Sequence, residues 1–421
     1  MRRWMVRALA ASTLLLGVTP GSLAKAADTD AATAEQTEAK RSVSQSTYER
    51  LTQAKKHMEQ GQYGEAARLL QELLPQVKDN DYETALTQQS LAYVYLDQKR
   101  YREAIRAMEA ALARPGLPRE VTHALRYNLA QVYIQTEEYR NGLAVLTQWL
   151  SDEKNPSADV YFLAAVAHHH LKQDEAAIRH IQKAIAKTPK PREDWHLFLL
   201  SLYFEHKRYQ EAVPILTQLV TQYPNKPSYW RYLTDVYLNL KREPEALATL
   251  KCAYHTGVLE AADRVRLAQL YLHQNLPYSA ARLLEREMAR GHISRTASHL
   301  ELLGNSWAMA RDHKRAIGSL QQAAGLVRHG NLYLTVAQLQ MNLEHWEEAS
   351  KSLDQALDKG GLKAPEEAQF LLGVACYHHD DKQRAVTALT QARKSPRYRT
   401  QAQRWLEQIQ GRAAWPRHGS K

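Results

Sequence analysis

The chain has 421 residues, of which 44% are hydrophobic and 24% charged, with a mean hydropathy of −0.55 and only two cysteines. This composition excludes collagen-like, disulfide-scaffold and fully disordered proteins. The net charge of +11 comes entirely from residues 1–26 and 393–421, because 44 basic residues balance 44 acidic ones in between. A protein that binds nucleic acid needs basic residues along its contact surface, so the neutral middle argues against that class.

Residues 1–26 are typical of a secretory signal peptide. Three arginines in the first seven residues precede an apolar run from Ala8 to Val18, and small residues allow cleavage near Ala26. This run is shorter than the roughly 20 residues of a membrane span, and no later stretch is long enough. We therefore expect a periplasmic mature protein that does not span the membrane; the alternative is an uncleaved N-terminal anchor.

Residues 27–47 contain a single valine and otherwise only alanine and polar or charged residues. Such a segment buries too little apolar surface to offset the entropy lost on ordering. We expect a flexible leader here, followed by a folded region over residues 48–396.

That folded region repeats a three-position pattern ten times, at intervals of 33–38 residues. A small residue marks where the second helix of a pair crosses the first, at Ala66, Ala104, Gly142, Ala177, Ala212, Ala246, Ala280, Ala316, Ala349 and Ala385. Twelve positions earlier the first helix supplies Ala54, Ala92, Ala130, Ala165, Leu200, Thr234, Ala268, Gly304, Ala337 and Gly373. Four positions later the second helix supplies Leu70, Met108, Leu146, Ile181, Leu216, Leu250, Leu284, Leu320, Leu353 and Leu389.

The sixth copy, Trp230-x2-Leu233-Thr234-x2-Tyr237 followed by Ala246-x3-Leu250, is close to the tetratricopeptide (TPR) pattern. The sequence therefore predicts an all-α TPR solenoid, a right-handed superhelix of about ten helix pairs. Residues 397–421 are expected to form a capping helix, with Trp405 and Leu406 facing inward, and a basic tail.

The two cysteines, Cys252 and Cys376, lie more than three repeats apart. Since a disulfide needs Cα atoms within about 7 Å, we expect two free, buried thiols. The basic tail favours a solubilising role, with contact to anionic lipid or an acidic partner as the alternative.

No catalytic or nucleotide-binding motif occurs in the chain, so we expect a protein that is not an enzyme and needs no cofactor. The histidine runs 168–170 and 378–379 are the only candidates for a metal or haem site. Neighbouring helical residues point about 100° apart, so neither run places its ligands on one face. We interpret them as partly exposed histidines at helix ends and expect no metal.

In a solenoid of this kind, partners bind the concave face, which is formed by first-helix residues that the core does not use. Aromatic and amide side chains at these positions suit an extended peptide. The alternative is a solvated inner face with the contact elsewhere. The predicted partner-binding residues are Tyr93, Tyr127, Gln131, Phe162, Arg231, Asp235, Gln269, His273, Asn305 and Gln338.

Residues 225–410 carry more particular features, notably Ala253-Tyr254-x2-Gly257 and Pro277-Tyr278-x-Ala280-Ala281. Together with Trp307-x2-Ala310 and Trp405, they resemble periplasmic TPR proteins associated with TonB–ExbB–ExbD energy-transduction systems. The resemblance implies a non-catalytic scaffold for TonB-dependent uptake of iron complexes or similar nutrients. Its partner would be TonB, a protein associated with ExbB–ExbD, or an outer-membrane receptor. The alternative function is a scaffold for envelope assembly or exopolysaccharide export.

Overall fold

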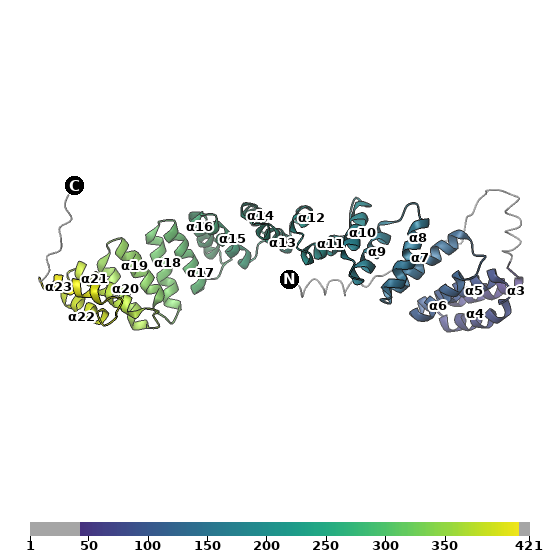
Figure 1. Ribbon diagram of the computed structural model, residues 1–421, viewed down its shortest axis with the longest axis horizontal. Coiled ribbons are helices and arrows are strands. Elements are labelled where there is room, and N and C mark those ends of the chain that lie inside the picture. The colour runs from purple at the N-terminus through teal and green to yellow at the C-terminus, as the bar shows by residue number, and fades with distance from the viewer. Residues whose placement is uncertain (1–42, 412–421) are drawn as a thin grey trace. The chain divides into compact units, whose positions relative to one another are not determined.

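The computed structural model describes residues 43–411, and over that range the protein consists of twenty-one α-helices without a strand (Figure 1). The all-α prediction is confirmed. The predicted signal peptide, most of the leader and the last ten residues of the tail lie outside the described residues. Within residues 43–411, no helix is both long enough and apolar enough to cross a bilayer.

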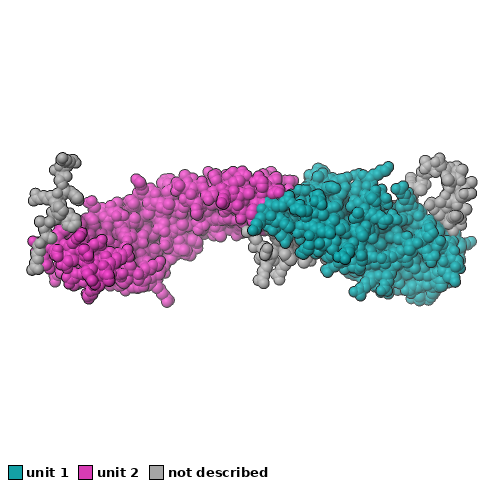
Figure 2. Space-filling model, in the orientation of Figure 1, with its two compact units in different colours: residues 1–208 teal, residues 209–421 magenta. Residues whose placement is uncertain are grey.

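The chain divides into two compact units, residues 1–208 and 209–421 (Figure 2). In unit 1 each described helix packs on the one that precedes it in the chain. Its helices are α3 (Gln45–Glu59), α4 (Tyr63–Val77), α5 (Asp81–Asp97), α6 (Tyr101–Leu112), α7 (Arg119–Gln135), α8 (Tyr139–Asp152), α9 (Ala158–His170), α10 (Asp174–Ala186) and α11 (Glu193–Glu205).

Unit 2 continues the same alternation of first and second helices and ends in the predicted cap, α23. Its helices are α12 (Tyr209–Gln222), α13 (Pro227–Asn239), α14 (Glu243–His255), α15 (Ala261–His273), α16 (Pro277–Ala289), α17 (Ala297–Met309), α18 (His313–Leu326), α19 (Asn331–Asn342), α20 (Trp346–Lys359), α21 (Pro365–His378), α22 (Lys382–Ala392) and α23 (Arg399–Ile409).

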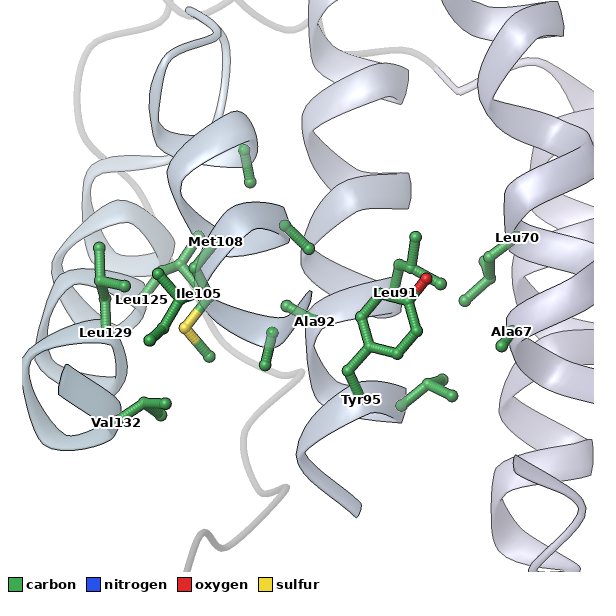
Figure 3. Close-up of a cluster of buried hydrophobic side chains, with 14 of the residues drawn as sticks. Ala67, Leu70, Leu91, Ala92, Tyr95, Ile105, Met108, Leu125, Leu129 and Val132 are labelled. Carbon is green, nitrogen blue, oxygen red and sulfur yellow. The ribbon is translucent and has the colours of Figure 1, made fainter. Parts of the chain in front are cut away.

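The three-position pattern describes the core of both units. All ten crossing residues, all ten first-helix partners and all ten residues four positions later are buried. Figure 3 shows one of the resulting clusters in unit 1, where Leu70, Ala92, Tyr95 and Met108 come together from three consecutive helices, α4 to α6. Small residues at the crossing let the two backbones approach, and the larger side chains fill the space around them.

The turn inside each helix pair also repeats. The amide of the residue before the second helix donates to the carbonyl five residues earlier, as Arg242 does to Tyr237 and Asp381 does to Cys376, both at 2.8 Å. The intervening residue is left-handed, and in nine of the ten described turns it is not glycine, with φ between 54° and 69°. These residues are Lys99, Glu137, Lys172, Lys207, Lys241, Asn275, Arg311, Glu344 and Asp380.

The leader is shorter than predicted, because α3 begins at Gln45 rather than after Thr47. The hydroxyl of Ser44 caps the helix by accepting from the amide of Thr47 at 3.3 Å. Thr47 is 1% exposed and donates to Glu83 on α5 at 3.0 Å. The segment is thus ordered by capping and a buried hydrogen bond, which an argument from apolar burial overlooks.

Both cysteines are free, as expected, but Cys252 is exposed and only Cys376 is buried. The prediction of a buried Cys252 was wrong because the residue stands two positions after Leu250, about 200° further around α14. In the cap, Leu406 is buried and the ring of Trp405 packs against Tyr377, with centroids 5.1 Å apart, so both face inward as predicted.

Candidate functional site

In unit 1, three of the predicted partner-binding residues are half-buried on neighbouring first helices. The hydroxyl of Tyr93 on α5 accepts a hydrogen bond from Asn128 on α7 at 3.3 Å. Tyr127 packs on Trp149 with ring centroids 5.1 Å apart. Burial raises the pKa of Tyr127, while a hydrogen bond with Gln131 acts in the opposite direction. The polar groups of Tyr93, Tyr127 and Gln131 therefore have partners within the protein.

Phe162, predicted to be an exposed aromatic of the inner face, is buried. Its ring packs against Trp195 and Phe198 of α11, with centroids 5.7 and 6.0 Å away. The first helix of the next pair covers it, so Phe162 belongs to the packing between α9 and α11 rather than to an open surface.

In unit 2, Arg231 and Asp235 of α13 form ion pairs with α15. Arg231 donates from Nε and Nη2 to the two carboxylate oxygens of Asp263, at 2.7 and 2.8 Å. This hydrogen bonding raises the pKa of Arg231 despite an opposing effect of burial. Asp235 pairs with Arg266. Asp263 is only 4% exposed, so these contacts hold two successive pairs together.

The remaining predicted residues are also in unit 2. Gln338 on α19 donates to Glu367 at 3.2 Å. Gln269 and His273 stand four residues apart on α15, and Asn305 lies on the next first helix, α17; all three are exposed. These three side chains are the part of the predicted set that stays open for a partner.

A hollow in unit 2 lies elsewhere, between the second helices α14 and α16, with residues of α15 at its base. We call it the α14–α16 groove; its volume is about 530 Å³. Three tyrosines and four basic side chains line it, against one carboxylate, Glu285, which pairs with Arg282 at 3.1 Å. These side chains are Tyr254, Tyr271, Tyr278, Lys251, His255, Arg282 and Arg286.

A buried carboxylate, Glu287 on α16, fixes the wall of this groove. Glu287 is 1% exposed and accepts hydrogen bonds from the hydroxyl of Tyr254 at 2.6 Å and from His292 at 2.9 Å. Arg264 Nε lies 3.0 Å away as an ion pair, without the alignment of a hydrogen bond. Burial would raise the pKa of Glu287, but the two hydrogen bonds and the charge of Arg264 outweigh it and lower the pKa.

The groove offers aromatic surface for apolar side chains and positive charge for carboxylates. The guanidinium of Arg286 lies 5.3 Å from the centre of the Tyr254 ring, and Tyr278 is 60% exposed. From the sequence, partner binding was expected on the first helices instead. Two tyrosines could have pointed to the groove from the sequence. Tyr254 lies in the segment Ala253-Tyr254-x2-Gly257 and Tyr278 in the segment Pro277-Tyr278-x-Ala280-Ala281, the two segments quoted above for the family resemblance.

The histidines of α9 are partly exposed side chains at a helix end, as expected. His169 pairs with Asp174 at 2.9 Å, and His168 stacks on His180 of α10 with centroids 5.0 Å apart. Burial, helped by the neighbouring positive charges, lowers the pKa of His180 to about 4. No metal-ligand group forms at these histidines in the described part of unit 1.

We expect His180 to make unit 1 less stable in mild acid. Below pH 6.5 His180 is protonated in the unfolded chain but stays neutral in the folded protein, because its folded pKa is about 4. The free energy of unfolding therefore falls as the pH drops from 6.5 towards 4. We expect a loss of about 1 kcal/mol from His180 between pH 7 and pH 5, after allowing for its partial exposure. The His180→Gln variant should show a correspondingly flatter dependence of melting temperature on pH, measured by circular dichroism; an unchanged slope would contradict the assignment.

One group of potential metal ligands lies together in the described part of the chain. It comprises Cys376, His379 and Asp381 at the turn between α21 and α22, with ligand atoms within 4.8 Å of one another. The sequence singles out His378 and His379 as a run, and no spacing rule connects either residue with Cys376.

Comparisons with known proteins identify the repeat type. Models of the tetratricopeptide repeat match residues 85–114 and 334–399, and the model of the ChAPs (Chs5p-Arf1p-binding proteins) matches residues 113–285. No curated protein matches the chain.

Several solved structures are similar to parts of the chain. YrrB, described as a TPR protein with an unusual peptide-binding site, is 15% identical over 45% of this chain and 96% of its own, with a TM-score of 0.37. MamA from Desulfovibrio magneticus is 14% identical over 39% of this chain and 93% of its own, with a TM-score of 0.32. The C-terminal part of a TPR protein from Cytophaga hutchinsonii is 13% identical over 66% of this chain and 99% of its own, with a TM-score of 0.37.

The repeat models match near both ends of the folded region, and the same buried register runs through all ten pairs. Repeats of this type form protein–protein interaction scaffolds. The chain contains tetratricopeptide repeats and has an all-α solenoid fold.

Proposed function

We propose that this protein is a periplasmic scaffold of a TonB-dependent uptake system and that its α14–α16 groove holds an acidic segment of the partner. The groove carries the proposal. It combines four basic side chains with three tyrosines, and two of those tyrosines belong to the segments that resemble the TonB-associated proteins. The export signal predicted at residues 1–26 supports the periplasmic location.

The chemistry of binding follows from the lining. Three basic side chains attract carboxylates of the partner: Lys251, Arg282 and Arg286. The exposed ring of Tyr278 offers a surface on which an apolar side chain of the partner packs. Glu287 holds Tyr254 in place before the partner arrives, which lowers the entropy lost on binding. Because the attraction is largely electrostatic and at the surface, binding should weaken as salt concentration rises.

The test is crosslinking in living cells grown with and without iron, using a C-terminally tagged protein and identification of what co-purifies. We expect TonB, ExbB, ExbD or a TonB-dependent receptor. The double variant Tyr278→Ala/Arg282→Ala should recover at least about tenfold less of that partner, as expected for hot-spot residues. The matched control is Tyr48→Ala/Arg68→Ala, which removes an exposed tyrosine and an exposed arginine from unit 1.

Two outcomes separate the parts of this proposal. Recovery of polysaccharide-export or envelope-assembly machinery, with no TonB component in either condition, would overturn the TonB assignment. Recovery of a TonB component that both double variants retain equally would leave that assignment standing and reject the groove as its binding site.

A further inference from the structure

The turn between α21 and α22 brings three side chains with metal-binding atoms together. Cys376 and His379 lie at the end of α21, and Asp381 immediately precedes α22. One ligand atom from each lies within 4.8 Å of the other two. All three belong to unit 2.

The backbone of this turn is not peculiar to the last pair. The Asp381 amide donates to the Cys376 carbonyl at 2.8 Å across a left-handed Asp380, which is the turn found in every described pair. What differs is the side chains. In none of the other nine described pairs do the three equivalent positions all carry His, Cys, Asp or Glu; the pair in α13–α14, for example, has Tyr237, Leu240 and Arg242.

One potential ligand atom of this group lacks a partner within the described protein. Nε2 of His379 is buried without a hydrogen bond, which costs free energy unless another group satisfies it. Cys376 is fully buried and stands where six other pairs place a tyrosine or tryptophan. Burial, the main cause, raises the pKa of its thiol to about 11.

We propose that Cys376, His379 and Asp381 bind one divalent transition-metal ion of the zinc class. A thiolate, an imidazole and a carboxylate are all ligands of Zn²⁺, and three protein ligands leave one coordination position open. Bond lengths of 2.0–2.3 Å around a tetrahedral ion put ligand atoms about 3.5 Å apart. The ligand atoms lie within 4.8 Å of one another, so side-chain movements of about 1 Å bring them to this separation.

Binding requires one chemical change in the protein. The S–H bond of Cys376 breaks, its proton leaves to solvent, and the sulfur electron pair forms the bond to the metal. Asp381 keeps its role as cap of α22, where Oδ1 accepts from the Arg384 amide at 3.1 Å, because each carboxylate oxygen has a second lone pair. The thiolate and the carboxylate together neutralise the ion.

Cobalt(II) provides the test, because it enters zinc sites and shows an absorption band when a thiolate is bound. We expect the full chain, reduced and purified without a histidine tag, to give this band at one ion per chain and to lose it when Zn²⁺ is added. Cys376→Ala should abolish the band. Asp381→Asn, which can still cap α22, should weaken Co²⁺ binding at least tenfold.

The exposed thiol on α14 supplies the matched control. Cys252→Ala should retain the full band, and Zn²⁺ should raise the melting temperature of that variant and of the original protein but not of Cys376→Ala. Absence of the band in the original protein, its survival in Cys376→Ala or its loss in Cys252→Ala would each overturn the proposal.

Discussion

Replacing Gly330 by alanine should destabilise unit 2 strongly. Gly330 precedes α19 at a point where the backbone of α20 leaves no room for a side chain. A Cβ there would stand 2.0 Å from the carbonyl oxygen of Ala356 and 2.7 Å from its carbonyl carbon. Neither atom can move without shifting α20, so we expect the free energy of unfolding to fall by about 3 kcal/mol, the upper end for overpacking.

The measurement is urea unfolding followed by circular dichroism, with hydrogen exchange of the α19 and α20 amides as a local readout. Gly325→Ala is the control, because a Cβ at this position in α18 meets nothing within 4 Å. That variant should be neutral or more stable, by up to about 1 kcal/mol, since alanine favours a helix over glycine. Equal effects of the two substitutions would show that the close approach at Ala356 does not control stability.

Glu287→Gln should cost the second large amount of stability. Glutamine keeps the shape of the side chain but removes the negative charge that Arg264, itself only 14% exposed, depends on. Removing one partner of a buried ion pair leaves the other charge without compensation, and we expect a loss of about 3 kcal/mol. Thermal and urea unfolding measure it.

The control for this substitution is Glu285→Gln on the same helix. Glu285 pairs with Arg282 at 3.1 Å in an exposed position, where ion pairs contribute little, so the expected change is below about 1 kcal/mol. If both variants lost the same small amount, Glu287 would not be the centre of the charge network below the groove.

The helix pairs could be read from the sequence because short-range spacing decides them. The distances from Thr234 to Ala246 and from Ala246 to Leu250 are fixed by helix geometry and one turn, and the same spacing recurs in every pair. The start of α3 was missed because capping by Ser44 and the buried hydrogen bond of Thr47 leave no apolar pattern.

The candidate sites depend on contacts that spacing does not encode. Phe162 is buried by residues some thirty positions further along the chain, and Arg231 meets Asp263 only because successive first helices stack. Cys376 and Asp381 were not connected because the 100° periodicity of a helix ends at the left-handed residue between them. The five-residue turn, not the helix, brings their side chains together.

The left-handed residue of each turn has a further consequence. For residues other than glycine this conformation costs about 1–2 kcal/mol. Substitution by glycine would remove that cost, but the greater conformational entropy of glycine in the unfolded chain would offset part of the stability gained. Nine of the ten described turns bear this cost, four of them on lysine. The solenoid is therefore less stable than the same architecture could be. The lost free energy of unfolding is divided among nine turns, so substitutions at single turns could change the stability of the protein in small, independent steps.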